Sequence, residues 1–262
     1  MPWNFPFWQV FRFGAPTLMA GNTCLLKHAS NVPQCALAIE EVFRDAGFPG
    51  GCFRTLLIPG SAVEAIIEDP RVCAVTLTGS KVAAASGRAL KKTVLELGGS
   101  DPFIVHADAD LEYTAGMAAR ARFQNTGQSC IAAKRFLVED SVAGEFERHF
   151  VAAVEQDPTD RATQVGPMAR ADLRDALDRQ VRTSVEQGAR VATGRRKLPG
   201  AGSFYAPTVL LAVTRGMPAF REETFAPPVR RRQGERLRAG AVVVRHPRVR
   251  QRPDDLDRPG GE

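Results

Sequence analysis

Short apolar runs alternate with amphipathic stretches along most of this chain, and Gly or Pro residues separate them. The run at 52–58, for example, ends at Pro59-Gly60. Runs this short, bounded by turn residues, are typical of strands, whereas apolar spacings of three and four residues are typical of helices. Strands that are apolar on both faces belong to parallel sheets covered by helices, so the sequence predicts an α/β fold. We expect strands at 22–27, 52–58, 73–77, 93–97, 102–105, 132–138 and 204–211, and helices at 31–46, 61–68, 82–90, from 110, at 142–155 and at 169–187.

A boundary between two lobes is expected near Gly98-Gly99, because a Gly pair is too flexible for the interior of a helix or strand. Residues 1–98 then form one unit and residues 99–228 a second. Residues 229–262 contain no aromatic residue, no Lys and no sustained periodicity, so we expect this tail to be disordered. The tail holds ten Arg against five acidic residues, which is +5 of the net charge of +6 and leaves +1 for residues 1–228. The basic charge therefore says little about the partners of the folded part.

The composition is that of an ordinary globular protein, with 44% hydrophobic and 24% charged residues. No apolar run is long enough for a membrane span, and the first residues lack the basic region of a signal peptide. We therefore expect a cytoplasmic protein whose five cysteines are reduced thiols. None of the cysteines forms a C-x-x-C pair and the four histidines are scattered, so no metal site is expected.

Cys130 follows the polar turn segment Phe123–Ser129 and precedes small residues and a strand. A cysteine on such a turn is open to a substrate, although a lone cysteine is often a buried, inert thiol. We expect Cys130 to be the most reactive of the five thiols. The others should be buried, with one on a helix and three in or beside strands: Cys35 on the helix, and Cys24, Cys52 and Cys73 near strands.

Two further residues, Glu96 and Asn4, each allow a catalytic and an ordinary structural interpretation. Glu96 lies inside the apolar run at 93–97, where it either finds a partner or has its pKa raised by burial, which would suit it to general-base work, unless it reaches solvent at the strand end. Asn4 stands between Pro2 and Pro6, which stiffen the backbone, so its amide is either an oxyanion donor or an ordinary turn residue.

Six segments of this chain stand in the order found in the NAD(P)-dependent aldehyde dehydrogenases, and the chain resembles that family over nearly all of residues 1–228. Phrases such as MPWNFPFWQV and LKKTVLELGGSDPFIV are most similar to the bacterial succinate-semialdehyde dehydrogenase branch. The resemblance implies an incomplete fold of that family, with part of a Rossmann-like cofactor-binding domain over 1–98 and part of a catalytic α/β domain over 99–228. The six segments are Met1–Val10, Leu25–Lys27, Leu77–Ser80, Leu95–Gly99, Phe123–Cys130 and Phe220–Phe225.

The resemblance also implies a role for each motif residue. Cys130 would attack an aldehyde as a thiolate, forming a thiohemiacetal and then a thioester. Asn4 and the backbone N–H of Cys130 would hold the oxyanion, and Glu96 would activate the water that releases the acid. These three groups should face one cavity, with their functional atoms within about 10 Å of each other. The residues implied in cofactor binding are Trp3, Lys27, Ser30, Gly79, Ser80, Glu223 and Phe225.

The choice of cofactor and substrate depends on two further positions. Ser30, three residues after Lys27, is small and neutral, so it permits the 2′-phosphate of NADP without excluding NAD. Arg12 lies eight residues after Asn4, where relatives that oxidise succinate semialdehyde carry an arginine. Its guanidinium either pairs with the remote carboxylate of the substrate or is an ordinary helix arginine.

The chain also departs from the family pattern. The segment between Ser80 and Glu96 is shorter by about six residues, or about 9 Å of helix, and the resemblance stops after Phe225. We expect a chain truncated at both ends, with residues 229–262 as an out-of-frame product.

Three functions remain open: an active aldehyde dehydrogenase, an impaired remnant of one, and a nucleic-acid binder acting through the tail. The tail has no aromatic residues for base stacking, so we expect a small aldehyde as partner, with neither nucleic acid nor membrane, and relatives that form homo-oligomers.

Overall fold

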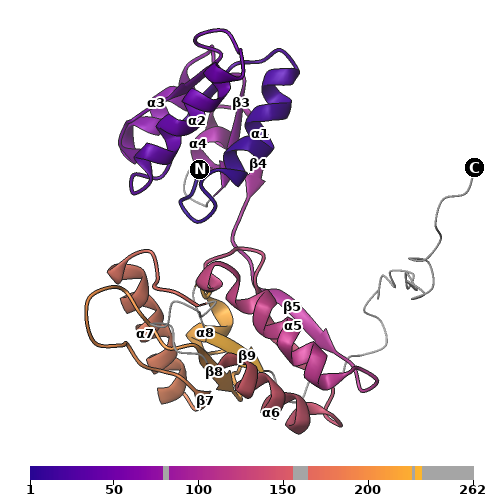
Figure 1. The fold of residues 1–262 in the computed structure, drawn as a ribbon. Helices are drawn as coiled ribbons and strands as arrows, with labels where there is room; N and C mark the ends of the chain where they lie inside the picture. The colour runs from indigo at the N-terminus through magenta and orange to yellow at the C-terminus, as the bar shows by residue number, and fades with distance from the viewer. Residues whose placement is uncertain (79–82, 156–164, 226–227, 232–262) are drawn as a thin grey trace, which may run out of the picture.

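The computed structural model describes residues 1–78, 83–155 and 165–225, together with the backbone of residues 228–231. Figure 1 shows the first described elements, α1 to β4, gathered in one lobe and the later ones, β5 to β9, in another. The chain crosses between the lobes through the segment that joins β4 to β5, which contains Gly98-Gly99. The end of the motif segment Leu95–Gly99 therefore lies at the crossing between the two lobes.

The N-terminal lobe begins with α1 and a small parallel sheet. Strand β1 pairs with β2, and α2 packs against them through Ala36, Ile39 and Phe43, which are almost fully buried. Gly14 on α1 faces the same cluster, and a Cβ there would lie in ordinary van der Waals contact with Phe43 at 3.4 Å and Phe53 at 3.5 Å. These four elements are α1 (Trp8–Met19), β1 (Cys24–Leu26), α2 (Pro33–Asp45) and β2 (Phe53–Thr55).

A second two-stranded sheet in this lobe pairs β3 with β4 in parallel. The prediction of strands buried on both faces is wrong here, because Val94 is 58% and Leu95 is 43% exposed, and adjacent residues of a strand point to opposite faces. The described elements therefore leave apolar side chains on both faces of β4 in contact with solvent. The elements of this part are η1 (Gly60–Ala62), α3 (Val63–Glu68), β3 (Ala74–Thr78), α4 (Ala83–Arg88) and β4 (Lys92–Glu96).

The C-terminal lobe is built on a five-stranded sheet in the order β5-β6-β9-β8-β7. All neighbouring strands are parallel except β7 and β8, which are antiparallel. The strands are β5 (Asp101–Val105), β6 (Ala133–Val138), β7 (Arg190–Thr193), β8 (Thr208–Leu211) and β9 (Pro228–Arg231). The helices are α5 (Leu111–Phe123), η2 (Gln124–Gly127), α6 (Ala143–Val154), α7 (Ala171–Glu186) and α8 (Pro218–Arg221).

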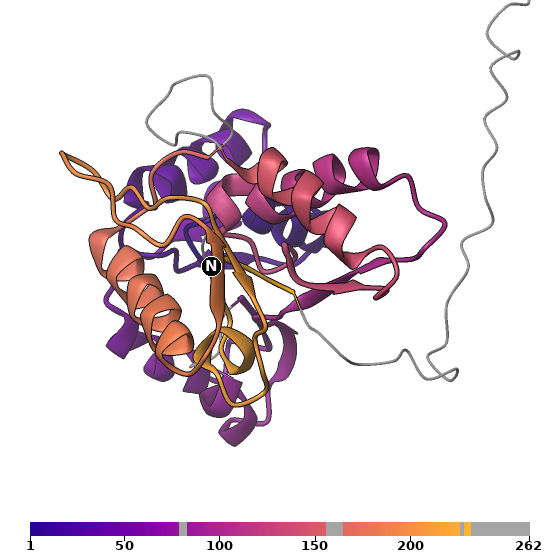
Figure 2. The same cartoon turned by 90° about the horizontal axis from the view of Figure 1, so that it is seen from below.

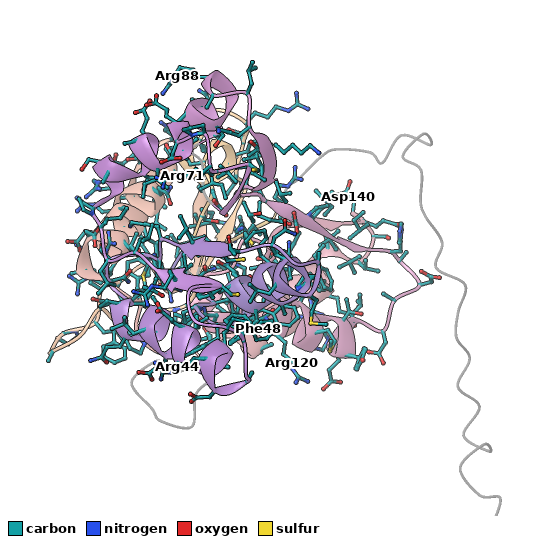
Figure 3. All side chains as sticks on the ribbon, turned by 90° about the horizontal axis from the view of Figure 1, so that it is seen from above. Arg44, Phe48, Arg71, Arg88, Arg120 and Asp140 are labelled. Atoms are coloured by element: carbon teal, nitrogen blue, oxygen red, sulfur yellow. The ribbon has the colours of Figure 1, made fainter. Side chains whose placement is uncertain are left out.

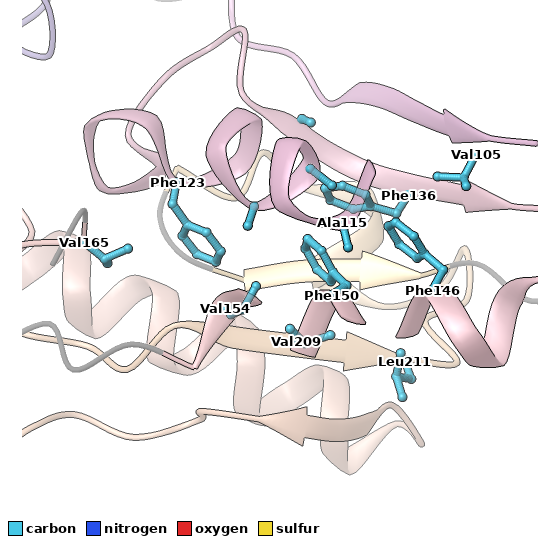
Figure 4. Close-up of a cluster of buried hydrophobic side chains, with 13 residues drawn as sticks. Val105, Ala115, Phe123, Phe136, Phe146, Phe150, Val154, Val165, Val209 and Leu211 are labelled. Atoms are coloured by element: carbon cyan, nitrogen blue, oxygen red, sulfur yellow. The ribbon is translucent and has the colours of Figure 1, made fainter. Parts of the chain in front are cut away.

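Helices cover both faces of this sheet, with α5 and α6 on one face and α7 on the other (Figure 2). Phe136 of β6 lies between Phe103 and Phe150, at ring distances of 5.4 and 4.9 Å, on the α5–α6 face (Figure 4). Strand β8 is buried on both sides: Val209 and Leu211 join that cluster, while Leu210 packs against α7. The C-terminal lobe is therefore a three-layer α/β structure of the predicted class.

Most predicted helices and strands are confirmed, with ends shifted by a few residues. Besides β9, three helices or strands were not predicted: α1, β7 and the short α8. The prediction of disorder from residue 229 onward is wrong for 229–231, which pair within β9 between β6 and β8. Residues 232–262, like Gly79 and Ser80, lie outside the described residues.

Charged side chains lie mainly on the surface; the labelled Arg44, Arg71 and Arg88 project outward (Figure 3) and are each more than 60% exposed. Within the described ranges, no helix has both the length and the apolar character that a membrane span requires. The same residues contain no group of three or more His, Cys, Asp or Glu placed to hold a metal ion.

Two glycines with positive φ give a matched test of packing in the C-terminal lobe. Gly194 has φ +86°, and a Cβ there would overlap the carbonyl oxygen of Pro207 and lie 2.7 Å from the Cα of Thr208. Gly200 has φ +97°, but a Cβ there would meet nothing within 4 Å. Both Ala substitutions carry a left-handed penalty of about 1–2 kcal/mol, and Gly194→Ala adds about 1–3 kcal/mol of overpacking. Urea unfolding should therefore rank Gly194→Ala as clearly less stable than Gly200→Ala; equal stabilities would contradict the packing of this turn.

Candidate active site

The loop before Cys130 has an unusual backbone. Helix α5 ends at Phe123, and the next turn contains Asn125 with φ 53° and Thr126 with φ 57°. Left-handed backbone is costly for a β-branched residue such as Thr126, and it persists only where the surroundings impose it. The prediction of a turn at Thr126-Gly127 is confirmed, and the contacts that impose this turn define the site.

Buried polar side chains hold the loop from the C-terminal lobe. Arg122 is fully buried and donates to the carbonyl oxygens of Gly127 at 3.4 Å and Thr224 at 3.2 Å. Gln128 is also buried; its Oε1 accepts from the backbone N–H of Ala169 at 2.9 Å, and its Nε2 donates to the carbonyl oxygen of Asn125 at 3.3 Å. The loop pairs some of its own backbone, as in the bond from the N–H of Gln128 to the carbonyl oxygen of Asn125 at 3.0 Å, and buried side chains bond further main-chain groups.

Asn4 reaches this loop from the N-terminal lobe. Its Nδ2 donates to the carbonyl oxygen of Gln128 at 2.9 Å, and its Oδ1 accepts from Nε2 of Gln9 at 3.2 Å. The backbone carbonyl of Asn4 accepts from Nδ2 of Asn125 at 2.8 Å. Asn4 is only 8% exposed, so its amide lies fixed at the backbone two residues before Cys130.

Lys134 lies in β6 with its side chain fully buried. Its Nζ donates to the carbonyl oxygens of Gly99 at 2.7 Å and Cys130 at 2.9 Å, and to Oε1 of Glu223 at 3.1 Å. Burial lowers the pKa of Lys134, and the hydrogen bond to Glu223 opposes that shift. One ammonium group therefore joins Cys130, the crossing between the lobes and Glu223.

Cys130 is half-buried. Of the other thiols, Cys24 is buried in β1 and its burial raises its pKa, while Cys35 on α2 and Cys52 beside β2 are half-buried. The prediction that Cys73 is buried is wrong: it lies beside β3 but is exposed, because that strand has a neighbour on one side only. Cys73 is therefore more exposed than Cys130, and exposure alone would make it the more reactive of the two thiols.

Glu96 is the last residue of β4 and forms an ion pair with Arg12 of α1. The Glu96 and Arg12 side chains are 46% and 54% exposed, so of the expected alternatives Glu96 has a partner and lies near solvent at the strand end, and it is not desolvated. Arg12, predicted to meet a substrate carboxylate or to be an ordinary helix arginine, has this carboxylate as its partner. The expected closeness of Glu96 to Cys130 stays a prediction.

Glu223 lies against the lobe crossing. A Cβ on Gly98 would overlap its carboxylate and come within 2.8 Å of its Cδ, and the backbone N–H of Gly99 donates to its Oε1 at 3.3 Å. Phe225 meets Trp3 edge to face, with ring centroids 5.9 Å apart. The sequence assigned Trp3, Glu223 and Phe225 to one binding site, and the structure brings the two aromatic rings into contact.

The segment after β1 contains Lys27 and Ser30. Lys27 is half-buried and Ser30 is exposed, with no carboxylate at that position. Between them, His28 is buried; its Nε2 lies 3.0 Å from the carbonyl oxygen of Pro6, and its Nδ1 accepts from the N–H of Ala29 at 2.8 Å. His28 thereby ties the end of β1 to the Pro2–Pro6 segment that contains Asn4.

Sequence reasoning missed the side chains that hold these residues in place. Arg122 and Lys134 could have been noticed, because each is a charged residue within an otherwise apolar buried stretch close to the Cys130 motif. Gln9, Asn125 and His28 carry no such signal, since polar residues at helix starts and turns are common.

The model of the aldehyde dehydrogenase family matches residues 1–230. The chain belongs to this family. It is 53% identical to the succinate-semialdehyde dehydrogenase [NADP(+)] of Mycobacterium avium over 236 residues, which cover 87% of this chain and 50% of that protein. It is 52% identical to the succinate semialdehyde dehydrogenase [NAD(P)+] Sad of Escherichia coli, covering 87% of this chain and 51% of that protein.

Solved structures give the same picture. The succinic semialdehyde dehydrogenase of Streptococcus pyogenes, in complex with NADP+, matches with a TM-score of 0.84 at 34% identity, over 88% of this chain and 53% of that one. The structure of Gox0499 matches with a TM-score of 0.84 at 41% identity, over 88% of this chain and 53% of its own. The chain thus spans about half the length of the curated relatives it matches. The described α/β architecture corresponds to part of the aldehyde dehydrogenase fold.

Removing the Lys134 ammonium tests its role as the central donor. Lys134→Met keeps the length of the side chain but leaves the Glu223 carboxylate and two carbonyl oxygens without their donor. Breaking a fully buried ion pair costs about 3–5 kcal/mol, and because the Glu223 side chain is 31% exposed we expect a loss near the lower limit. The matched control is Arg135→Met, which removes one bond, from Nε to the carbonyl oxygen of Ser100, and should cost about 1 kcal/mol. Chemical denaturation of both variants would contradict this role if the losses were equal.

His28 should make the fold sensitive to acid. Burial, assisted by the nearby positive charges of Met1 and Lys27, lowers its pKa below 6.5, so the unfolded chain binds a proton at a higher pH than the folded chain does. The contribution of His28 to stability is therefore complete above pH 6.5 and is lost as the pH falls below that value. Between pH 8 and pH 5, the unfolding free energy of the wild type should fall further than that of His28→Asn. Parallel pH profiles would show that folding does not lower the pKa of His28.

Proposed function

We propose that this chain carries the cysteine chemistry of an aldehyde dehydrogenase, with Cys130 as the nucleophile. The Cys130 thiolate would attack the aldehyde carbon, forming a C–S bond while the carbonyl electron pair moves to oxygen. The amide of Asn4 and the backbone N–H of Cys130 would stabilise that oxyanion. The observation that carries this proposal is the bond from Asn4 to the carbonyl oxygen of Gln128, because it fixes an amide donor at the backbone two residues before Cys130.

The second half of the reaction would use Glu96. Glu96 would take a proton from the water that attacks the thioester carbon, releasing the acid and the Cys130 thiol. In the structure its partner is Arg12, which we propose binds the remote carboxylate of succinate semialdehyde. Because both side chains are about half-exposed, the substrate carboxylate can replace Glu96 on Arg12 and free Glu96 for the water.

The residues around the lobe crossing fit NAD or NADP. When bound, the nicotinamide accepts the hydride that leaves the substrate carbon. Glu223 and the Trp3–Phe225 pair would hold the nicotinamide ribose and its ring, and the absence of a side chain at Gly98 makes room for the Glu223 carboxylate itself. Lys27 would bond the adenosine ribose, and Ser30 permits a 2′-phosphate; Gly79 and Ser80, proposed for the pyrophosphate, lie outside the described residues. On this basis residues 1–98 bind the cofactor and residues 99–228 supply the nucleophile.

The compartment and partners follow from the same proposal. All five cysteines are free thiols in the structure, which fits the reducing cytoplasm. The proposed partner is a small aldehyde, and the tail from residue 232 is assigned no nucleic-acid or membrane role. We further propose that the catalytic assembly is a homo-oligomer.

The assay is oxidation of succinate semialdehyde with NADP+ or NAD+, measured as reduced cofactor. Cys130→Ala should abolish the reaction, and Glu96→Gln should slow acid release by about 10²–10⁴-fold while leaving a first-turnover burst. Cys73→Ala, which removes the more exposed thiol, should leave the rate unchanged. Activity that survives in Cys130→Ala would exclude the proposed nucleophile.

A second candidate function is an impaired form of the same enzyme. It is favoured by the apolar side chains of β4, because the described elements leave Val94 58% and Leu95 43% exposed, on opposite faces of the strand. In that case the 262-residue chain would show little cofactor-dependent oxidation and still hydrolyse an activated ester slowly through Cys130, because ester cleavage needs no hydride acceptor. Turnover with NADP+ that greatly exceeds ester hydrolysis would exclude this candidate.

A further inference from the structure

We propose that Gln9 is a positioning residue that holds the amide of Asn4 in the orientation needed to stabilise an oxyanion. This inference rests on the proposed function of Asn4 and Cys130. It assigns a role to a residue that contacts neither the thiol nor, in the proposed reaction, the substrate. Gln9 acts through a single contact, the hydrogen bond from its Nε2 to Oδ1 of Asn4 at 3.2 Å.

The orientation of both amides follows from one backbone group. The carbonyl oxygen of Gln128 can only accept, so the atom of Asn4 that lies 2.9 Å from it must be the NH₂ group. The Oδ1 of Asn4 then faces Gln9, and Gln9 must present its own NH₂ there. The Gln128 carbonyl therefore determines which atom of the Asn4 amide is the nitrogen, and the Asn4 amide in turn determines which atom of the Gln9 amide is the nitrogen.

This arrangement leaves one donor of Asn4 for chemistry. A side-chain amide has two N–H groups, and only one of them is used by Gln128. The main chain of Asn4 is held separately, because Asn125 donates to its carbonyl oxygen at 2.8 Å. Asn125 therefore fixes where Asn4 lies, and the Gln128 carbonyl and the Gln9 amide together fix which way its amide faces.

Gln9 lies in a largely buried environment in which its bond to Asn4 is the contact that favours an amide side chain. Its neighbour Val10 is 1% exposed and anchors the first turn of α1 in the core of the N-terminal lobe. The Oε1 of Gln9 is buried and has no hydrogen-bond partner among the described residues. A buried acceptor without a donor costs free energy, and an apolar side chain of the same length would avoid that cost. The Nε2 bond to Asn4 is the polar contact that offsets it.

Gln9→Glu is the sharpest test, because it keeps the shape and replaces a donor by an acceptor. The carboxylate would repel Oδ1 of Asn4 and compete with the Gln128 carbonyl for its NH₂ group, so the amide would no longer be held with its donors toward the loop. Gln9→Met keeps the length but only removes the bond. Gln34→Glu is the matched control: it makes the same change on an exposed residue of α2 and should have no effect.

Two reactions of Cys130 separate positioning from general damage. Hydrolysis of 4-nitrophenyl acetate develops an oxyanion, whereas alkylation by iodoacetamide does not. Removing a full oxyanion donor costs about 10²–10³-fold in rate, so we expect Gln9→Glu to slow hydrolysis by about 10- to 100-fold and to change alkylation less than about twofold. At pH 5 the Gln9→Glu rate, taken relative to the wild type, should partly recover, because a protonated carboxyl can donate again.

Equal losses in hydrolysis and alkylation, or wild-type hydrolysis in Gln9→Glu, would overturn the role of Gln9. If Cys130→Ala hydrolyses the ester as fast as the wild type, the proposed function fails instead. In that case the hydrogen bond between Gln9 and Asn4 is tested by a double-mutant cycle, which compares the unfolding free energies of Gln9→Met, Asn4→Ala and the double variant. Non-additive losses would support the coupling of the two amides, and additive losses would overturn it.

Discussion

The hydrogen bond from Asn4 to the carbonyl oxygen of Gln128 joins the two lobes at the point where the candidate chemistry is placed. It spans 124 positions of sequence and connects a segment stiffened by Pro2 and Pro6 to a loop in left-handed backbone. Neither partner is rigid through regular secondary structure. Each therefore depends on the other for its position, and the rest of the site is arranged around that mutual support.

Buried cations do the corresponding work inside the C-terminal lobe. Arg122 and Lys134 each donate to main-chain carbonyl oxygens of the loop and of a segment distant in sequence, Thr224 in one case and Gly99 in the other. Burying a charge is costly, and these two are stabilised by several acceptors at once. The acceptors within the loop are the carbonyl oxygens of Gly127 and Cys130, which follow the left-handed residues Asn125 and Thr126. The buried cations therefore hold the chain just after its strained turn.

The sequence predicted what depends on local pattern and missed what depends on distant contact. Strand β5 and helix α5 were predicted closely, and the N-cap at Asp110, which accepts from the N–H of Tyr113, is a local signal. Helix α1 was not predicted, because it is rich in aromatic residues and contains Pro16. Strand β7 is only four residues long and starts at the charged Arg190. In the site, the turn before Cys130 was visible in the sequence, whereas the Glu96–Arg12 pair joins residues 84 positions apart and has no local signature.

Strand β9 occupies an interior place in the five-stranded sheet although it is the last strand in the described chain. During synthesis β6 and β8 emerge first, and each has an open edge until residues 228–231 have left the ribosome and can insert between them. Open strand edges bind other chains readily. The C-terminal lobe must therefore complete its sheet after nearly all of its own helices have formed, and the nascent protein passes through a stage in which a chaperone that covers strand edges has a defined place to act.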